Sequence, residues 1–282
     1  MKRTWIVTGS SVGLGRAIVE AALAAGHNIV ATARTPRTLD DLAARSPDSL
    51  LAQRLDVTNG AEARAVVAAA VDRFGSVDVL VNNAGFAGVG SVEDMPLELV
   101  EKQLSTNFMG ALLTSRAVLP VMRSQARGRI ILISSIGART ATAGAGVYYA
   151  TKAAVSSLAE SLALEVEPLG IKVTAVEPGA MRTRFAKADS MEVAPFDAAY
   201  ERTVGATVAM MRSTDFSSVA NDPAIHAAMI LRLATLENPP TRLLAGGDAF
   251  EWATGADTRR RASDAQWEAF SRSEIRNEAR AR

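Results

Sequence analysis

The stretch "TGSSVGLG", residues 8–15, follows a short apolar run and opens a segment with helical periodicity. Glycines at such a junction let the backbone turn tightly and approach a phosphate, which then meets the free N–H groups of the helix N-terminus. The spacing of Gly9, Gly13 and Gly15 is not the usual G-x-G-x-x-G, and no P-loop lysine is present. Since glycine turns also occur for steric reasons, the stretch indicates a nucleotide site only in combination with others.

The chain around this turn alternates short apolar runs with segments of helical periodicity. The runs predict buried strands at 5–8, 28–32, 50–55, 77–82, 129–134 and 172–177. The segments between them predict helices at 13–25, 39–44, 60–74, 96–125 and 147–166. The alternation predicts an α/β fold, a Rossmann-like doubly wound parallel sheet in three layers, with ligands at the carboxyl ends of its strands.

We find no linker that divides this pattern, so residues 1–282 are expected to form a single domain. Residues 1–183 are expected to be the cofactor-binding and catalytic core. Residues 184–240 mix Met, Phe, Ala and charge, which is typical either of a substrate-binding lid or of amphipathic helices packed on the core.

The end of the chain, 241–282, has a different character. It begins with "TRLLAGGDA", residues 241–249, which looks like a last strand of the sheet. The arginine-rich tail from Thr258 is expected to be a solvated helix with Trp267 and Phe270 as anchors.

The composition excludes several classes of function. The chain has a net charge of +1 and few aromatic residues, which disfavours nucleic-acid binding. It has no cysteine and only two histidines, so thiolate chemistry is excluded and no metal site is expected. The sequence shows neither a signal peptide nor a membrane span, so a cytoplasmic protein without membrane contact is expected.

Two further predicted strands end in residues suited to a nucleotide. "RLDVT", 54–58, places Asp56 where it could accept from an adenine amine, and "NNAG", 82–85, offers small residues beside which a nucleotide could lie. Either stretch could be a simple turn. Three strand ends at one edge of the sheet favour a dinucleotide.

The end of the second predicted strand indicates which dinucleotide binds. An acidic residue there would bind the ribose 2′-hydroxyl, whereas an arginine accommodates a 2′-phosphate. The sequence has Ala33 followed by Arg34, which favours NADP over NAD.

The pair Tyr148 and Lys152 lies one helical turn apart near the start of a predicted helix, so both side chains share a face. Ser135 ends a predicted strand thirteen residues before the tyrosine. The neighbouring Tyr149 has neither a lysine four residues later nor a serine thirteen residues earlier.

Together these stretches resemble the short-chain dehydrogenase/reductase family, in its shorter single-domain branch. The resemblance covers residues 4 to about 183 and rests on the motifs above, on Asn107 in "STNFMG" and on Pro178-Gly179 followed by Thr183. It implies a hydride-transferring enzyme that interconverts a ketone or aldehyde and an alcohol. Relatives that use NADP often carry a basic residue just before the middle glycine of the turn, where this chain has Val12, so use of both NADP and NAD stays open.

The resemblance also implies the roles of the site residues. Tyr148 would be the general acid or base, with its phenolate favoured by the nearby ammonium and the positive nicotinamide ring. Ser135 would stabilise the substrate oxygen, Lys152 would hold the nicotinamide ribose, and Asn107 would hold a helix bend and a water. The expected cofactor contacts are Gly9, Ser11, Gly13, Leu14, Gly15, Arg34, Asp56, Val57, Asn83, Ala84, Gly85, Tyr148, Lys152, Pro178, Gly179 and Thr183.

Two other functions remain as alternatives. One is a dinucleotide sensor or scaffold without turnover, which a broken Tyr-Lys pair would have supported. The other is a sugar-nucleotide epimerase or dehydratase of the family's longer branch, which usually needs a larger substrate domain and G-x-x-G-x-x-G. An NAD-dependent alcohol dehydrogenase is a further alternative, which differs from the expected NADP-dependent oxidoreductase in its cofactor.

Substrate and assembly are predicted only in outline. An apolar carbonyl compound is expected from residues that either line a pocket or belong to the core, namely Phe86, Met181, Phe185, Met191, Phe196, Met210, Met211 and Phe216. A homodimer or homotetramer is expected through the helices at 96–125 and 147–166, unless their apolar stripes only meet the sheet. His27 and His226 are expected to be structural.

Overall fold

The computed structural model describes residues 1–181, 192–213 and 221–280, with side chains described through residue 273. Seven parallel strands form one sheet in the order β3-β2-β1-β4-β6-β7-β9. Their bounds are β1 Thr4–Val7, β2 Asn28–Ala33, β3 Leu50–Arg54, β4 Val79–Asn82, β6 Gly128–Ile133, β7 Ile171–Pro178 and β9 Arg242–Ala245.

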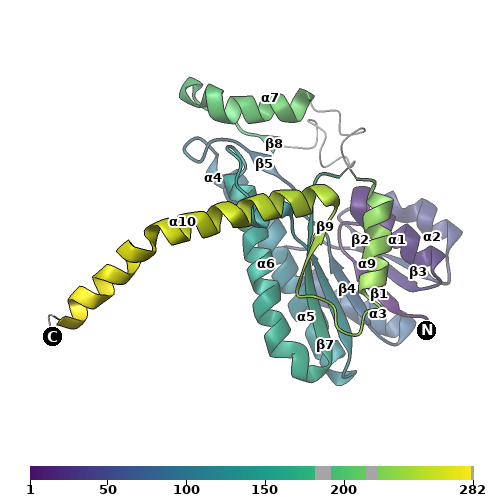
Figure 1. Cartoon of the computed structure of the whole chain (residues 1–282). Helices are drawn as coiled ribbons and strands as arrows, with labels where there is room; N and C mark the ends of the chain where they lie inside the picture. Colours follow the sequence, from purple (N-terminus) through teal and green to yellow (C-terminus); the bar gives the residue numbers. More distant parts are fainter. Residues whose placement is uncertain (182–191, 214–220, 281–282) are drawn as a thin grey trace.

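Helices cover both faces of this sheet (Figure 1). One face packs against α1 (Gly13–Ala24), α2 (Asp40–Arg45) and α9 (Pro223–Leu233), and the other against α3 (Gly60–Phe74), α5 (Gly110–Ser124) and α6 (Gly146–Val166).

The alternation of side chains along each strand explains the continuous apolar runs. Trp5 and Val7 of β1 join the core under α1, whereas Ile6 joins the core on the opposite face. Because both faces are covered, both sets of positions are mostly apolar. The predicted Rossmann-like, three-layer single domain is confirmed.

The strand order reverses between β1 and β4, because β2 and β3 lie on one side of β1 while β4 and the later strands lie on the other. Ligands of open parallel sheets bind outside the carboxyl ends of the strands at such a switch point. The glycine turn after β1 and the "NNAG" stretch after β4 flank this point.

The long helix predicted at 96–125 is divided. It consists of α4 (Leu97–Gln103), a π-helical turn η2 (Leu104–Met109) and α5. A π turn widens a helix locally and often marks a functional position. Here it carries Asn107, with 2% of its surface exposed.

The segment predicted as lid or packed helices divides, where it is described, into a part that packs on the sheet and a part beyond the edge of the sheet. α9 packs on the sheet beside α1. In contrast, α7 (Ala206–Ser213) lies beyond the carboxyl edge of the sheet with the small parallel pair β5 (Gly88–Val89) and β8 (Glu192–Val193) (Figure 1).

Most of the predicted pocket residues that are described belong to cores. Phe196 and Met211 pack into the small core under α7, and Phe86 packs with Met95 and Leu99. Met181 packs on the main core, whereas Met210 is 54% exposed. The others, Phe185, Met191 and Phe216, lie outside the described residues.

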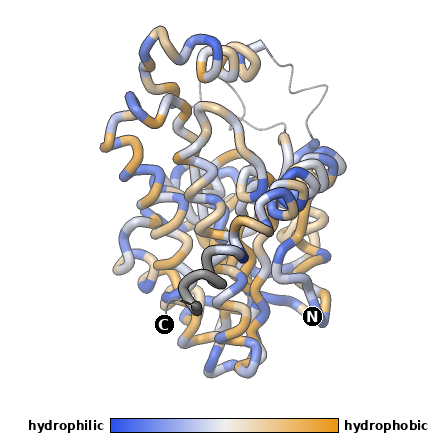
Figure 2. The backbone as a smooth tube through the Cα atoms, turned by 60° about the vertical axis from the view of Figure 1, so that its left-hand side comes forward, coloured by the Kyte–Doolittle hydropathy of each residue, from blue (hydrophilic) through white to orange (hydrophobic). Residues whose placement is uncertain are grey.

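The last strand is shorter than predicted, because α10 (Gly247–Arg280) begins within the stretch 241–249. The first turns of α10 bury Ala249 and Ala253 against the core, and the helix then projects away from the body (Figures 1 and 2).

The expectation that Trp267 and Phe270 anchor this tail is wrong. They are 55% and 59% exposed and pack edge-to-face against each other at 5.9 Å between ring centroids. Because α10 projects away from the body of the protein, these two rings stay exposed to solvent.

Both histidines are structural, as predicted. His27 stacks on Trp5 with ring centroids 5.7 Å apart, and buried His226 lies with Nε2 3.1 Å from the Ala245 carbonyl. Across the described residues, no helix is long and apolar enough to cross a membrane. The same residues contain no His, Asp and Glu cluster suited to a metal ion.

Candidate active site

The glycine turn presents the start of α1 to the switch point. Gly9 and Gly13 have φ values of +65° and +61°, a conformation that L side chains rarely adopt. Val12, the N-cap residue of α1, makes no side-chain capping hydrogen bond. Among the described residues, no side chain accepts from the N–H groups of the first turn. Such N–H groups are suited to a pyrophosphate. Leu14 is 5% exposed and packs in the core, whereas Ser11 is partly exposed.

The turn and the "NNAG" stretch are locked together. The Thr8 hydroxyl accepts from the backbone N–H groups of Asn83 at 2.9 Å and Ala84 at 3.0 Å. Asn83 Nδ2 donates to the carbonyls of Thr8 at 3.0 Å and Gly9 at 3.1 Å. A Cβ at Gly15 would lie 2.3 Å from the Gly9 carbonyl oxygen. The sequence therefore needs glycine here for close packing of the cradle itself.

The predicted adenine and 2′-phosphate contacts lie beside this cradle. Asp56 Oδ1 accepts from the Thr58 hydroxyl at 2.7 Å, and the hydrogen bonds from Thr58, with a smaller effect of the Arg34 charge, lower the pKa of Asp56. Arg34 is exposed and has no carboxylate within ion-pair distance in the described part of the chain. Val57 is 7% exposed and packs against Gly110, which leaves only its backbone for a nucleotide.

Asn107 joins the "NNAG" stretch to α6. Its Oδ1 accepts from the Phe86 backbone N–H at 3.0 Å, and its Nδ2 donates to the Phe86 carbonyl at 2.9 Å and to the Thr151 hydroxyl at 3.0 Å. A Cβ at Gly85 would lie 3.0 Å from Asn107 Oδ1 and 3.4 Å from Lys152 Nζ. Gly85 therefore lies against Asn107 and Lys152, two of the four predicted catalytic side chains.

Ser135 and Tyr148 meet as predicted. Their side chains are hydrogen-bonded, and Ser135 Oγ also accepts from the Gly137 N–H at 3.0 Å. Burial of the phenol raises the pKa of Tyr148 above its ordinary value, and the hydrogen bond from Ser135 opposes this rise without cancelling it. The sequence predicted a lowering of this pKa by the ammonium, whereas burial is the largest influence on it and raises it. The protonated phenol is the form that a general acid requires.

Lys152 lies one turn after Tyr148 on α6, and 4% of its surface is exposed. Its Nζ donates to the Ile133 carbonyl at 2.8 Å and lies 5.8 Å from the centroid of the Tyr148 ring. Burial lowers the pKa of Lys152 from its usual 10.5 to about 8. The ammonium is therefore charged at neutral pH and can orient a hydroxyl.

Tyr149, the other tyrosine of the doublet, supports the site. Its ring packs on Gly137, where a Cβ would come within 2.2 Å of two ring carbons. Its hydroxyl lies 3.4 Å from Thr142 Oγ1. Tyr149 thus holds the loop that presents Ser135, and the only sign of this role in the sequence is its position next to Tyr148.

The segment after β7 is braced by residues that sequence reasoning missed. Asp248 accepts from the Ala180 N–H at 2.7 Å and from Asn221 Nδ2 at 3.1 Å. Pro178 pairs with Ala245 in the sheet, and Gly179 leaves room for the Asp248 carboxylate. Only the fold brings α10 to this loop. Thr183, another predicted cofactor contact, lies outside the described residues.

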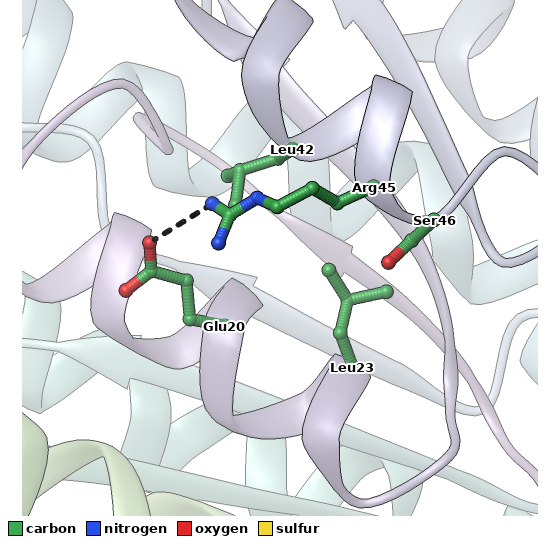
Figure 3. A pocket seen from close by; sticks show the side chains of 5 residues that line it. All are labelled: Glu20, Leu23, Leu42, Arg45 and Ser46. Atoms are coloured by element: carbon green, nitrogen blue, oxygen red, sulfur yellow. Dashed lines mark ion pairs between the residues drawn. The ribbon is translucent and has the colours of Figure 1, made fainter.

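A small pocket lies elsewhere, between α1 and α2 (Figure 3). An ion pair between Glu20 and Arg45, 3.8 Å apart, crosses it. The other lining residues are Leu23, Leu42 and Ser46. None of these five is a predicted site residue, so the pocket has no part in the chemistry at the strand ends.

This fold and this constellation define a nicotinamide-dependent oxidoreductase, and comparison with known proteins agrees. The family model described as short chain dehydrogenase matches residues 3–193. The chain belongs to this family.

Three relatives illustrate the likeness. An oxidoreductase named BOA17 from Botryotinia fuckeliana is 39% identical over 272 residues, which is 96% of this chain and 98% of the relative. The crystal structure of a short-chain dehydrogenase from Streptomyces avermitilis has a TM-score of 0.89 and 43% identity, covering 97% of this chain and 98% of that one. A serine dehydrogenase complexed with NADP+ has a TM-score of 0.73 and 28% identity, covering 86% and 94%.

Proposed function

We propose that this protein is an NADP(H)-dependent oxidoreductase that interconverts a ketone or aldehyde and an alcohol. The observation that carries the proposal is the partly buried phenol of Tyr148, hydrogen-bonded to Ser135 and set one helical turn from the Lys152 ammonium. A phenol that remains protonated, beside a hydroxyl donor and a cation, is suited to give a proton to a carbonyl oxygen.

The residues present fit a nicotinamide dinucleotide. The uncapped start of α1, the narrow Gly9–Gly15 cradle and the exposed Arg34 are suited to its phosphates, and Lys152 to the hydroxyls of its nicotinamide ribose. When bound, the cofactor supplies the hydride.

The protein groups manage the oxygen of the substrate. In reduction, Ser135 donates to the carbonyl oxygen while Tyr148 transfers its proton to it, which leaves a tyrosinate. The Lys152 charge stabilises that anion, and Asn107 holds the Phe86 backbone and Thr151 around the site. In oxidation the proton moves from the alcohol to the tyrosinate.

Titration with nicotinamide nucleotides tests the proposal. Purified protein is titrated with NADPH and separately with NADH, followed by nicotinamide fluorescence, and is then assayed with a panel of ketones and aldehydes by loss of nicotinamide absorbance. Tighter binding of NADPH and turnover of a carbonyl compound are expected. Binding without turnover of any compound would favour a sensor or scaffold, and binding of neither nucleotide would contradict the site.

The preference for NADP rests on Ala33 and Arg34 and is supported by the relative that binds NADP+. Exchanging the pair, with Ala33→Asp and Arg34→Ala, is expected to shift the ratio of specificity constants towards NADH by at least about tenfold, because a carboxylate repels the 2′-phosphate and accepts from the 2′-hydroxyl. Arg34→Ala alone should weaken NADPH and leave NADH unchanged. An unchanged ratio in the double variant would place the phosphate elsewhere.

Activity is expected to fall as the pH rises above about 8. Burial lowers the pKa of Lys152 to about 8, so its charge is present below that pH and is lost above it. The raised pKa of Tyr148 keeps the phenol protonated over the same range. The measurement is NADPH affinity and kcat/KM for reduction from pH 6 to 9.5.

Lys152→Arg is the control for this pH dependence. Its guanidinium keeps its charge past about pH 12, so whatever NADPH affinity it retains should not decline between pH 8 and 9.5. A parent profile that stays level to pH 9.5 would contradict the role of the ammonium.

The substrate, the cellular location and the assembly of the protein are proposed as well. We infer that the substrate is an apolar carbonyl compound, which the exposed apolar side chains of Val92 and of Met210 on α7 support. We also infer that the protein is cytoplasmic, which cell fractionation would test. A homodimer or homotetramer is supported by Leu104, Met109 and Leu164, which are exposed on the η2 and α6 surfaces. A strictly monomeric mass by light scattering would contradict the assembly.

A further inference from the structure

A buried carboxylate next to the active site has no part in the mechanism above. Glu177, in β7, has no exposed surface. Arg139 donates from Nε to Glu177 Oε2 at 2.6 Å, and Arg242 donates from Nη2 to Oε1 at 2.6 Å. Both arginine side chains are about three-quarters buried. Taking such charges out of water offsets much of their attraction, so the cluster is better explained by the arrangement it fixes than by stability.

The partners of Glu177 come from the elements that carry the catalytic residues. Arg139 ends the short η3 turn (Ile136–Ala138) that follows Ser135. Ser156 lies in α6, one helical turn after Lys152, and its Oγ is 2.8 Å from Glu177 Oε1. One carboxylate therefore ties the Ser135 loop to the catalytic helix.

A run of hydrogen bonds continues from this carboxylate to the lysine. Ser156 Oγ lies 2.8 Å from Ser134 Oγ, and Ser134 Oγ lies 2.8 Å from the Lys152 carbonyl oxygen. Two hydroxyls have one proton each and the carboxylate and carbonyl oxygens only accept, so at most two of these three contacts are hydrogen bonds at one time. At its other end Lys152 donates to Ile133, next to Ser134 in sequence.

The C-terminal helix reaches the same cluster from outside. Asp257 of α10 lies 3.9 Å from Arg139, and Arg260 donates to the Arg139 backbone carbonyl. Ala249 and Ala253 of α10 pack against Ile136 in the same loop. The loop is thus held between α10 and the buried carboxylate.

We propose that Glu177 is a positioning residue, whose ion pairs set the separation of Ser135, Tyr148 and Lys152 in the reacting geometry. The inference rests on the proposed function. It follows from the placement of Ser135 on one tied element and of Tyr148 and Lys152 on the other. Misplacement of a reacting group by about 1 Å can slow a reaction by about a hundredfold.

Glu177→Gln tests the proposal, because it keeps the shape of the side chain and removes its charge. With the variant pre-saturated with NADPH, single-turnover hydride transfer to a carbonyl substrate of the parent is expected to slow by about ten- to a hundredfold. The Kd for NADPH should stay within about twofold, because the cluster does not contact the glycine cradle. The isotope effect with deuterated NADPH should rise, since hydride transfer becomes the slowest step.

Glu160→Gln is the matched control. Glu160 lies 3.6 Å from the same Arg242, but it is 51% exposed and does not tie the Ser135 loop. This variant is expected to match the parent in rate and isotope effect. A merely structural Glu177 would reduce the fraction of active protein and leave the rate per active site and the isotope effect unchanged, which would overturn the proposal.

Ser156→Ala keeps every charge, and it is the second test of the proposal if Glu177→Gln does not fold. Its expected slowing is about three- to tenfold, with the same rise in the isotope effect. A folded Ser156→Ala with parental hydride transfer would overturn the proposal in that case. A parent that reduces no carbonyl compound would contradict the proposed function and this inference together, whereas an active parent matched by its Glu177→Gln variant would contradict the inference alone.

Discussion

Tyr148→Phe is expected to lower the rate of carbonyl reduction by about a thousandfold, within the range that general acid catalysis contributes. The variant keeps the ring that packs beside Tyr149, with centroids 5.8 Å apart, and loses only the hydroxyl that meets Ser135. Without that proton donor, the developing alkoxide must take its proton from water. Steady-state reduction of a carbonyl substrate by NADPH measures the loss.

Nucleotide binding separates this chemical effect from a structural one. Because the glycine cradle and Arg34 are untouched, the Kd of Tyr148→Phe for NADPH should stay within about threefold of the parent value. Tyr149→Phe is the matched control, since the same hydroxyl deletion there removes only a 3.4 Å contact to Thr142 and should retain most activity. Turnover of Tyr148→Phe at the rate of the parent would contradict the proposed mechanism.

Gly15→Ala is expected to cost the protein most of its nucleotide affinity, at least about a hundredfold for NADPH. The added Cβ would lie 2.3 Å from the Gly9 carbonyl oxygen and 2.5 Å from Asn83 Nδ2, so the turn must move away from the strand beside it. Alanine is the better helix former by about 1 kcal/mol, and overpacking costs about 1–3 kcal/mol. Because the added Cβ would overlap a backbone oxygen, the cost of overpacking outweighs the gain in helix propensity.

Gly247→Ala is the control for this substitution. Gly247 also stands at the start of a helix, but a Cβ there would meet no atom within 4 Å. Fluorescence titration with NADPH and thermal unfolding of both variants give the comparison. Gly247→Ala should match the parent, and a Gly15→Ala variant that binds NADPH equally well would refute the cradle as the phosphate site.

The central sheet could be predicted from sequence because each strand carries its own signal. Parallel strands covered on both faces are continuous apolar runs, so β1, β2 and β7 were located within one or two residues. The boundary at Gly60–Phe74 was also predicted, since Asn59 caps the helix with its side chain and Gly75 ends it with a φ of +79°. These are local features of composition and spacing.

The predicted catalytic residues come together for the same reason. Ser135 ends a strand, while Tyr148 and Lys152 lie four residues apart on one helix, and the carboxyl ends of parallel strands share an edge. The fold therefore brings them together once its topology is known. The pKa of Tyr148 was not predictable, because burial is a property of the assembled site and here raises that pKa.

By itself the sequence determined the doubly wound fold, the glycine cradle and the Asn107, Ser135, Tyr148 and Lys152 set, because these depend on periodicity and on short motifs. Only the tertiary structure decided the direction of the Tyr148 pKa, the bracing of the loop after β7 by Asp248 and the joining of Ser135 to the catalytic helix through Glu177. Such contacts join residues far apart in the chain, and no local pattern encodes which distant side chain fills a buried space.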